Sequence, residues 1–136
     1  MSDRTDLGIL ILRIGIGLNM MVMSGWGKVT GGEAMLRMVG GSLPSFGWSE
    51  MPLVWGCLAA FAEFFCSGFL ILGVFFRFSL LMLGFTMSVA VSVNLGMPAG
   101  SEHAGWHGAS SALTYLAVYL PLLITGPGKH VITLKK

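Results

Sequence analysis

Glu63 is a single carboxylate in the middle of an almost entirely apolar run. It lies in residues 58–70 (LAAFAEFFCSGFL), where Ser67 is the only hydroxyl. The chain has six acidic residues in all, so the placement of this one is informative. An ionisable group in an apolar segment is costly and marks a functional site by default. It predicts binding of a quinone headgroup, a proton or a cation; the alternative is a carboxylate that pairs with a base and clips two helices together.

Two other pairs of side chains could carry chemistry. Cys57 and Cys66 are nine residues apart, which places them on opposite sides of one helix, and they form no Cys-x-x-Cys motif. We therefore expect them to pack as small hydrophobic residues. His103 and His107 would share a metal ion only if the last helix began early, and the loop composition opposes this. We therefore predict no metal site. His103 and His107 are weak candidates for metal ligands.

The composition is that of a membrane protein. Of the 136 residues, 54% are hydrophobic and 10% charged, and the mean hydropathy is +0.81, whereas soluble domains carry about 25% charged residues. Four apolar segments approach or exceed the roughly 20 residues that span a bilayer, and none alternates like a barrel strand. We predict an all-α membrane protein, an antiparallel bundle of four transmembrane helices in one domain over residues 1–136, with helices at 7–29, 51–76, 78–95 and 106–125.

The basic residues indicate the orientation. With an even number of helices, both termini and the link between the second and third helices lie on one side. Six of the eight basic residues fall there, which predicts cytoplasmic termini, and the net charge of +2 is no sign of nucleic-acid binding. The first segment lacks a basic start and a cleavage site, so we expect it to stay in the protein. The six are Arg4, Arg13, Arg77, Lys129, Lys135 and Lys136.

Glycine and proline mark the connections. Residues 30–50 contain two glycine pairs, and we expect residues 33–39 between them to form one or two turns of interfacial helix. The link at Arg77 is minimal and predicts a tight antiparallel hairpin of the second and third helices. Residues 126–130 (GPGKH) should stop the last helix, because glycine ends a helix and proline cannot continue it.

Polar residues fall on helix stripes that we expect to face the bundle interior, since successive helical residues turn by about 100°. Glu63 shares its face with small residues, which permit close helix contact in a bilayer. The first helix carries a similar stripe that ends at Lys28. The stripe of the last helix that we expect to face inward is His107, Ser111, Thr114, Val118, Pro121 and Thr125.

The depth of each polar side chain in the bilayer determines which of them can come into contact. Side chains lean toward the N-terminus of their own helix, which moves Lys28 and Glu63 toward each other in the outer half of the bundle. Arg13 lies near the inner end and leans away, so we expect it to reach the cytoplasmic interface. Burial and a nearby ammonium act oppositely on Glu63, so its charge state stays open. We predict a polar ligand pocket of Glu63, Lys28, Ser24, Asn94, Ser111 and Thr114, framed by Trp26, Trp55 and Tyr115.

Three motifs together resemble the DoxX family of small four-helix membrane proteins. They are residues 24–29 (SGWGKV) before a Gly-rich loop, residues 62–64 (AEF) followed by 72–77 (LGVFFR), and residues 126–129 (GPGK). The resemblance covers nearly the whole chain and implies a bundle in a bacterial inner membrane, associated with quinone- or thiol-linked redox systems. Ser24 and Asn94 stand where many relatives have histidine. If those histidines serve redox chemistry, this member lacks it.

We therefore expect an accessory integral-membrane subunit of a larger redox-linked complex, with no independent activity, because haem, flavin and Fe–S motifs are absent. The alternative is a quinone- or thiol-linked oxidoreductase subunit with a ligand pocket around Glu63. Quinone is the candidate ligand. A small transporter is less favoured, since the sequence has no inverted repeat. The expected partners are the lipid bilayer and other membrane subunits or a second copy of the chain, and no nucleic acid.

Overall fold

The computed structural model describes residues 3–42 and 50–131. Lys135 and Lys136, which enter the charge asymmetry, lie outside this range. Within it, four helical spans are long and apolar enough to cross a membrane. The first comprises α1 (Asp3–Met20), the π-helical turn η1 (Met21–Gly25) and α2 (Trp26–Thr30); the second comprises α4 (Pro52–Phe61), the π-helical turn η3 (Ala62–Cys66) and α5 (Ser67–Leu72); the third and fourth are α6 (Phe76–Gly96) and α7 (Gly105–Thr125).

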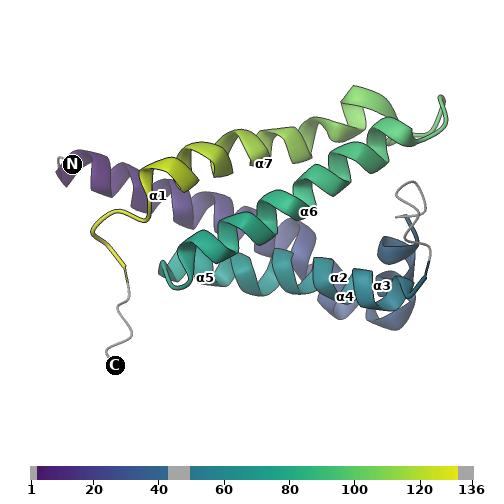
Figure 1. The fold of residues 1–136 in the computed structure, drawn as a ribbon, viewed down its shortest axis with the longest axis horizontal. Helices are drawn as coiled ribbons and strands as arrows, with labels where there is room; N and C mark the ends of the chain where they lie inside the picture. The colour runs from purple at the N-terminus through teal and green to yellow at the C-terminus, as the bar shows by residue number, and fades with distance from the viewer. Residues whose placement is uncertain (1–2, 43–49, 132–136) are drawn as a thin grey trace.

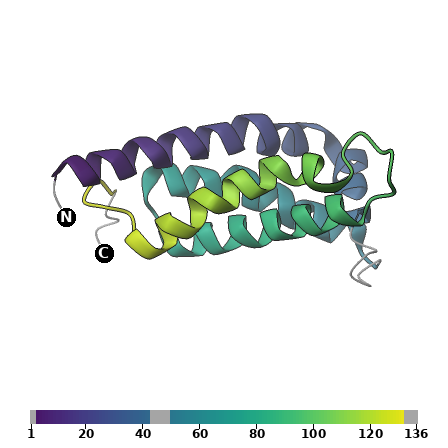
Figure 2. The same cartoon turned by 90° about the horizontal axis from the view of Figure 1, so that it is seen from above.

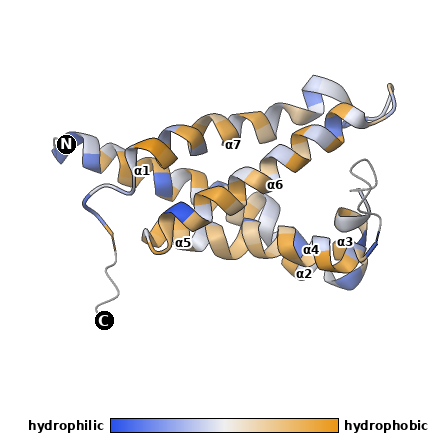
Figure 3. Cartoon of the chain, viewed as in Figure 1, coloured by the Kyte–Doolittle hydropathy of each residue, from blue (hydrophilic) through white to orange (hydrophobic). Residues whose placement is uncertain are grey.

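The spans form an antiparallel bundle, as predicted. Figures 1 and 2 show the start of α1 and the end of α7 at one end of the bundle, which we call the terminal end. Helix α3 (Gly32–Gly41) and the α6–α7 connection lie at the other end, the α3 end. The spans are mostly hydrophobic along their length, and hydrophilic residues gather toward their ends (Figure 3). At the terminal end, the Asp6 carboxylate accepts a hydrogen bond of 3.3 Å from the Lys129 backbone N–H.

Helix α3 confirms the helical segment predicted between the glycine pairs. It packs against α4 through glycines on both helices. A Cβ added to Gly40 would collide with the Pro52 backbone, and one added to Gly56 would collide with the Leu36 backbone. Because α3 is held this closely, it covers the start of the second span.

The second span ends earlier than predicted. We expected it to continue to residue 76, but α5 ends at Leu72. Gly73 and Phe75 take left-handed conformations with φ of 74° and 48°, and these reverse the chain before α6 begins at Phe76. Glycine adopts positive φ without steric cost, so Gly73 sets the helix end.

Arg13 is fully buried, and the prediction that it reaches the interface is wrong. Its guanidinium donates hydrogen bonds to the carbonyls of Leu70 and Ile71 at the end of α5, at 3.0 and 2.9 Å. It also donates to the carbonyls of Pro127 and His130 beyond α7, at 2.6 and 3.0 Å. The last carbonyls of a helix lack intrahelical donors and carry the negative end of its dipole. Backbone carbonyls thus accept the hydrogen bonds that we expect Arg13 to donate to water.

Candidate functional site

Lys28 and Glu63 form a direct ion pair between the first two spans. The Lys28 ammonium, in α2, donates a hydrogen bond to the Glu63 carboxylate, in η3. The Glu63 side chain is 3% exposed and that of Lys28 is 17% exposed. The structure thus brings these two groups together, as their lean along opposed helices suggested.

The two π-helical turns bring the spans close enough for this contact. Turns η1 and η3 pack against each other, with Gly25 at the contact. A Cβ added to Gly25 would lie 2.8 Å from the backbone carbonyl of Glu63, so this position leaves no room for a side chain. Lys28 follows Gly25 by three residues, about one turn, and reaches back over Glu63. Single π-helical turns occur frequently at functional sites.

The ion pair borders empty space. A cavity of about 170 Å³, which we call the ion-pair cavity, lies between the first three spans and α3. Its charged lining groups are those of Lys28 and Glu63. Its polar lining also includes Asn94, whose side-chain amide donates to the Ala90 carbonyl at 2.9 Å. The remaining lining residues are Val39, Ser42, Trp55, Ala59, Thr86, Val89, Ala90 and Val93.

A protein-family comparison identifies this architecture. The DoxX family model matches residues 8–95. The chain belongs to the DoxX family. The matched stretch contains both partners of the ion pair and Asn94. Comparison with curated proteins and with solved structures gave no match.

In this DoxX chain, four of the predicted site residues line the ion-pair cavity: Glu63, Lys28, Asn94 and Trp55. Ser24 is half-buried within η1 but is not among the lining residues. Trp26 is 58% exposed, and its ring lies 6.1 Å from that of Phe64.

Three predicted residues lie on α7, away from the lining of the cavity. Ser111 and Thr114 are exposed, so the prediction that their stripe faces inward is wrong. The Thr114 hydroxyl donates to the Ser110 carbonyl of its own helix at 2.9 Å, which removes its need for an interior partner. The Tyr115 hydroxyl instead donates to the side-chain oxygen of Asn19, and its ring stacks on that of Tyr119. The buried face of α7 is Ala109, Ala112, Tyr119 and Leu122.

The histidine pair of this DoxX chain does not share a helix. His103 lies in the turn before α7, which begins at Gly105, whereas His107 lies inside α7, and both are exposed. Among the described residues there is no group of three or more His, Cys, Asp or Glu side chains arranged to hold a metal ion. Cys57 is exposed and Cys66 buried, and both thiols are free.

Sequence reasoning missed part of the lining. Thr86, Ala90 and Asn94 follow one another at a spacing of four, so the α6 face that bears Asn94 could have been extended to Thr86. The contribution of α3, through Val39 and Ser42, had no such signal. It depends on the close packing of α3 on α4, which the pattern of polar residues does not encode.

Proposed function

We propose that this DoxX protein is an accessory membrane subunit that holds an amphiphile with a polar headgroup, such as a quinone, for a redox-linked complex. The observation that carries this proposal is the ion pair of Lys28 and Glu63 beside an open cavity. Charged groups within a membrane span are costly and rare outside functional sites. If the ion pair only joined two helices, we would expect side chains to pack densely around it, since a void loses packing energy.

The chemistry of the ion pair suits both redox states of a quinone. The Lys28 ammonium can donate a hydrogen bond to a quinone carbonyl, and the Glu63 carboxylate can accept one from a quinol hydroxyl. The cavity also has room for a six-membered ring, because apolar cavities of about 150 Å³ bind benzene and this one measures about 170 Å³. Binding and orientation are what these residues supply; the electron transfer would belong to the quinone and to partner subunits.

Ligand titration tests the proposal. The protein, purified in mild detergent, is titrated with decyl-ubiquinone while tryptophan fluorescence is followed, since Trp55 lines the cavity. We expect saturable quenching, and we expect Glu63→Gln and Lys28→Met each to weaken affinity at least about tenfold, the loss of a charge-assisted hydrogen bond. Glu33→Gln is the matched control, because Glu33 is an exposed acid paired with Arg37 on α3. Equal affinity in all variants, or no saturation, would refute the proposal.

A second candidate function is a purely structural accessory subunit, in which the ion pair clips the first two spans together. The direct contact between α2 and η3 favours it. Native mass measurement of the untagged protein, extracted gently, separates the candidates. A stoichiometric partner that is retained by a ligand-free protein supports the structural role. A protein that retains bound quinone together with its partner supports the ligand-holding role.

We infer that the protein lies in a bacterial inner membrane with both termini in the cytoplasm. The charge asymmetry supports this, with Arg4, Arg77 and Lys129 toward the terminal end and Lys28 and Arg37 toward the α3 end. Reporter fusions test it: a phosphatase that is active only outside the cytoplasm should be inactive after residue 136 and active when inserted after residue 100. The opposite pattern would invert the topology.

A further inference from the structure

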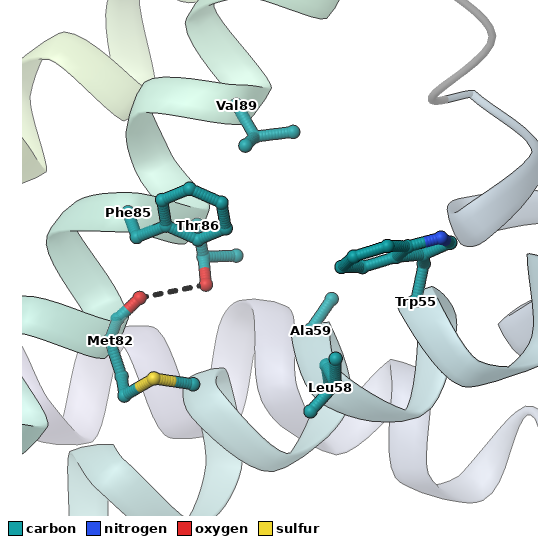
Figure 4. Close-up of a pocket in the computed structure, with 7 residues that line it drawn as sticks. All are labelled: Trp55, Leu58, Ala59, Met82, Phe85, Thr86 and Val89. Atoms are coloured by element: carbon teal, nitrogen blue, oxygen red, sulfur yellow. Dashed lines mark hydrogen bonds between the residues drawn. The ribbon is translucent and has the colours of Figure 1, made fainter. Parts of the chain in front are cut away.

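A second, apolar cavity adjoins the ion-pair cavity. It measures about 150 Å³ and lies between α4 and α6; we call it the apolar cleft. Figure 4 shows its lining, with Phe85, Thr86 and Val89 on α6 facing Trp55 and Ala59 across the space. The other lining residues are Leu58 and Met82. The two cavities adjoin each other, because four residues line both of them: Trp55, Ala59, Thr86 and Val89.

The apolar cleft opens toward the surface that would face lipid. Leu58 is 43% exposed and Phe85 54% exposed, on opposite walls. The reason lies in the path of α6, which packs against α5 and η3 but diverges from α4 toward the α3 end (Figure 1). The two spans are therefore in contact at the depth of η3 and separated beside α4, where the cleft forms.

Polarity changes sharply along the two cavities. The ion-pair cavity is bordered by an ammonium and a carboxylate, whereas the apolar cleft has a single hydroxyl within residues 3–42 and 50–131, that of Thr86. That hydroxyl donates to the Met82 carbonyl of its own helix at 2.9 Å, so its proton is already engaged. A ligand that fills both cavities must therefore have a polar head and a hydrocarbon tail.

The charge of the head follows from the lining. Lys28 and Glu63 together are net neutral, and among the described residues no further charged group lines either cavity. A phosphate headgroup would need an excess of positive charge, as Arg and Lys clusters provide. An uncharged ring with carbonyl or hydroxyl groups needs only one donor and one acceptor, which the ion pair supplies.

We propose that an uncharged, ring-headed amphiphile enters sideways from the lipid through the apolar cleft, placing its head at the ion pair and its tail along Leu58, Met82 and Phe85. This inference rests on the proposed function, and it adds the route of entry and the site of the tail. The cleft holds a benzene-sized volume, about six carbons, so it contacts the first part of the tail and the rest lies in the bilayer.

A steric block in the cleft tests the position of the tail, from which the entry route is inferred. Leu58→Trp fills the apolar cleft without touching the ion-pair cavity, and Leu18→Trp is the control, because Leu18 is a comparably exposed leucine, 47%, on α1. Two probes are titrated in lipid nanodiscs: decyl-ubiquinone and the same ring without its decyl tail. We expect Leu58→Trp to weaken decyl-ubiquinone binding at least tenfold and to change binding of the tail-less ring less than twofold, with Leu18→Trp matching wild type.

The outcomes separate the two proposals. If wild type binds neither probe, the proposed function fails, and this inference fails with it. If wild type binds both probes and Leu58→Trp leaves decyl-ubiquinone binding unchanged, the placement of the tail in the cleft is wrong, and the entry route with it, while the proposed function stands. Equal losses for both probes would also overturn the placement of the tail, because the bound tail-less ring makes no contact with the cleft. Binding that is seen in detergent but abolished by the phospholipid of the nanodisc would assign the cleft to a lipid instead.

A measurement on the unaltered protein removes any dependence on how a variant folds. Decyl-ubiquinone with a photoreactive diazirine early in its tail is irradiated with wild-type protein in nanodiscs, and the labelled peptides are identified. We expect adducts at Leu58, Met82 or Phe85. Adducts confined to the groove between α6 and α7, at Leu120 or Leu123, would overturn the inference.

Discussion

Replacement of Arg13 should destabilise the bundle more than replacement of any exposed basic residue. The change is Arg13→Met, which keeps a long side chain and removes the charge and all donors. In the structure the guanidinium donates four hydrogen bonds of 2.6–3.0 Å and lies 5.6 Å from the centre of the Phe76 ring. These contacts join α1 to the end of α5 and to the segment after α7.

The expected loss is about 3–5 kcal/mol in the free energy of unfolding. A hydrogen bond to a charged group contributes about 1.5–3 kcal/mol, which for four bonds gives roughly 6–12 kcal/mol. Two terms reduce this value. The Leu70 carbonyl keeps a second donor, the Gly73 N–H at 3.2 Å. His130 is exposed, so we expect water to replace the guanidinium at its carbonyl. Burial of the guanidinium also costs several kcal/mol, which methionine does not incur.

The assay is reversible unfolding by SDS in mild-detergent micelles, followed by circular dichroism. Arg4→Met is the matched control, since Arg4 is exposed on the same helix and should change stability by about 0.5 kcal/mol or less. Arg13→Lys keeps the charge but concentrates its donors on one atom, so we expect about half of the loss. If Arg13→Met and Arg4→Met lose equal stability, the carbonyl anchor contributes nothing and the reasoning is wrong.

Three further predictions concern the site. In a double-mutant cycle measured by SDS unfolding, Lys28→Met and Glu63→Gln should each lower the free energy of unfolding by about 3 kcal/mol. The double variant should lose less than the sum, with a coupling of at least about 1 kcal/mol, and additive losses would exclude a buried pair. Gly25→Ala should lower the free energy of unfolding by about 1–3 kcal/mol and weaken quinone binding. Gly27 has open space around it, so Gly27→Ala should be neutral or stabilising, and equal effects of the two variants would contradict the close contact of η1 and η3. A lipophilic maleimide should modify Cys57 in the folded protein and leave the buried second thiol intact until SDS is added, as mass spectrometry would detect; modification of both thiols at one rate would contradict this.

The amino-acid sequence is sufficient to predict the bundle and the ion pair between its first two spans. The apolar segments exceed the length of a bilayer crossing, so the four spans follow from hydropathy alone. The contact between Lys28 and Glu63 follows from the direction in which helical side chains lean. Both inferences use constraints that act within one helix or between two neighbours, and such constraints are visible in the order of residues.

The errors arose where a polar group had a partner that the sequence does not mark. Their polarity places Ser111 and Thr114 in the interior, but Thr114 donates a hydrogen bond to its own helix and both residues are exposed. The charge of Arg13 predicts a position at the aqueous interface, but its guanidinium binds helix-end carbonyls instead. In a bilayer, backbone carbonyls compete with water as partners, so polarity alone does not reveal which way a side chain points.

The π-helical turns explain why the site forms at this depth. Each such turn changes the angular phase of the residues that follow it, so polar stripes drawn at a constant 100° lose their alignment beyond η1 and η3. Gly25 in η1 then packs on the backbone of Glu63, and Lys28 one turn later covers the carboxylate. Ion pair and cavity thus have separate causes: two wide turns in contact fix the charges, and the path of α6 away from α4 leaves the space beside them. A ligand-holding role requires this combination, whereas a helix clip would need the ion pair alone.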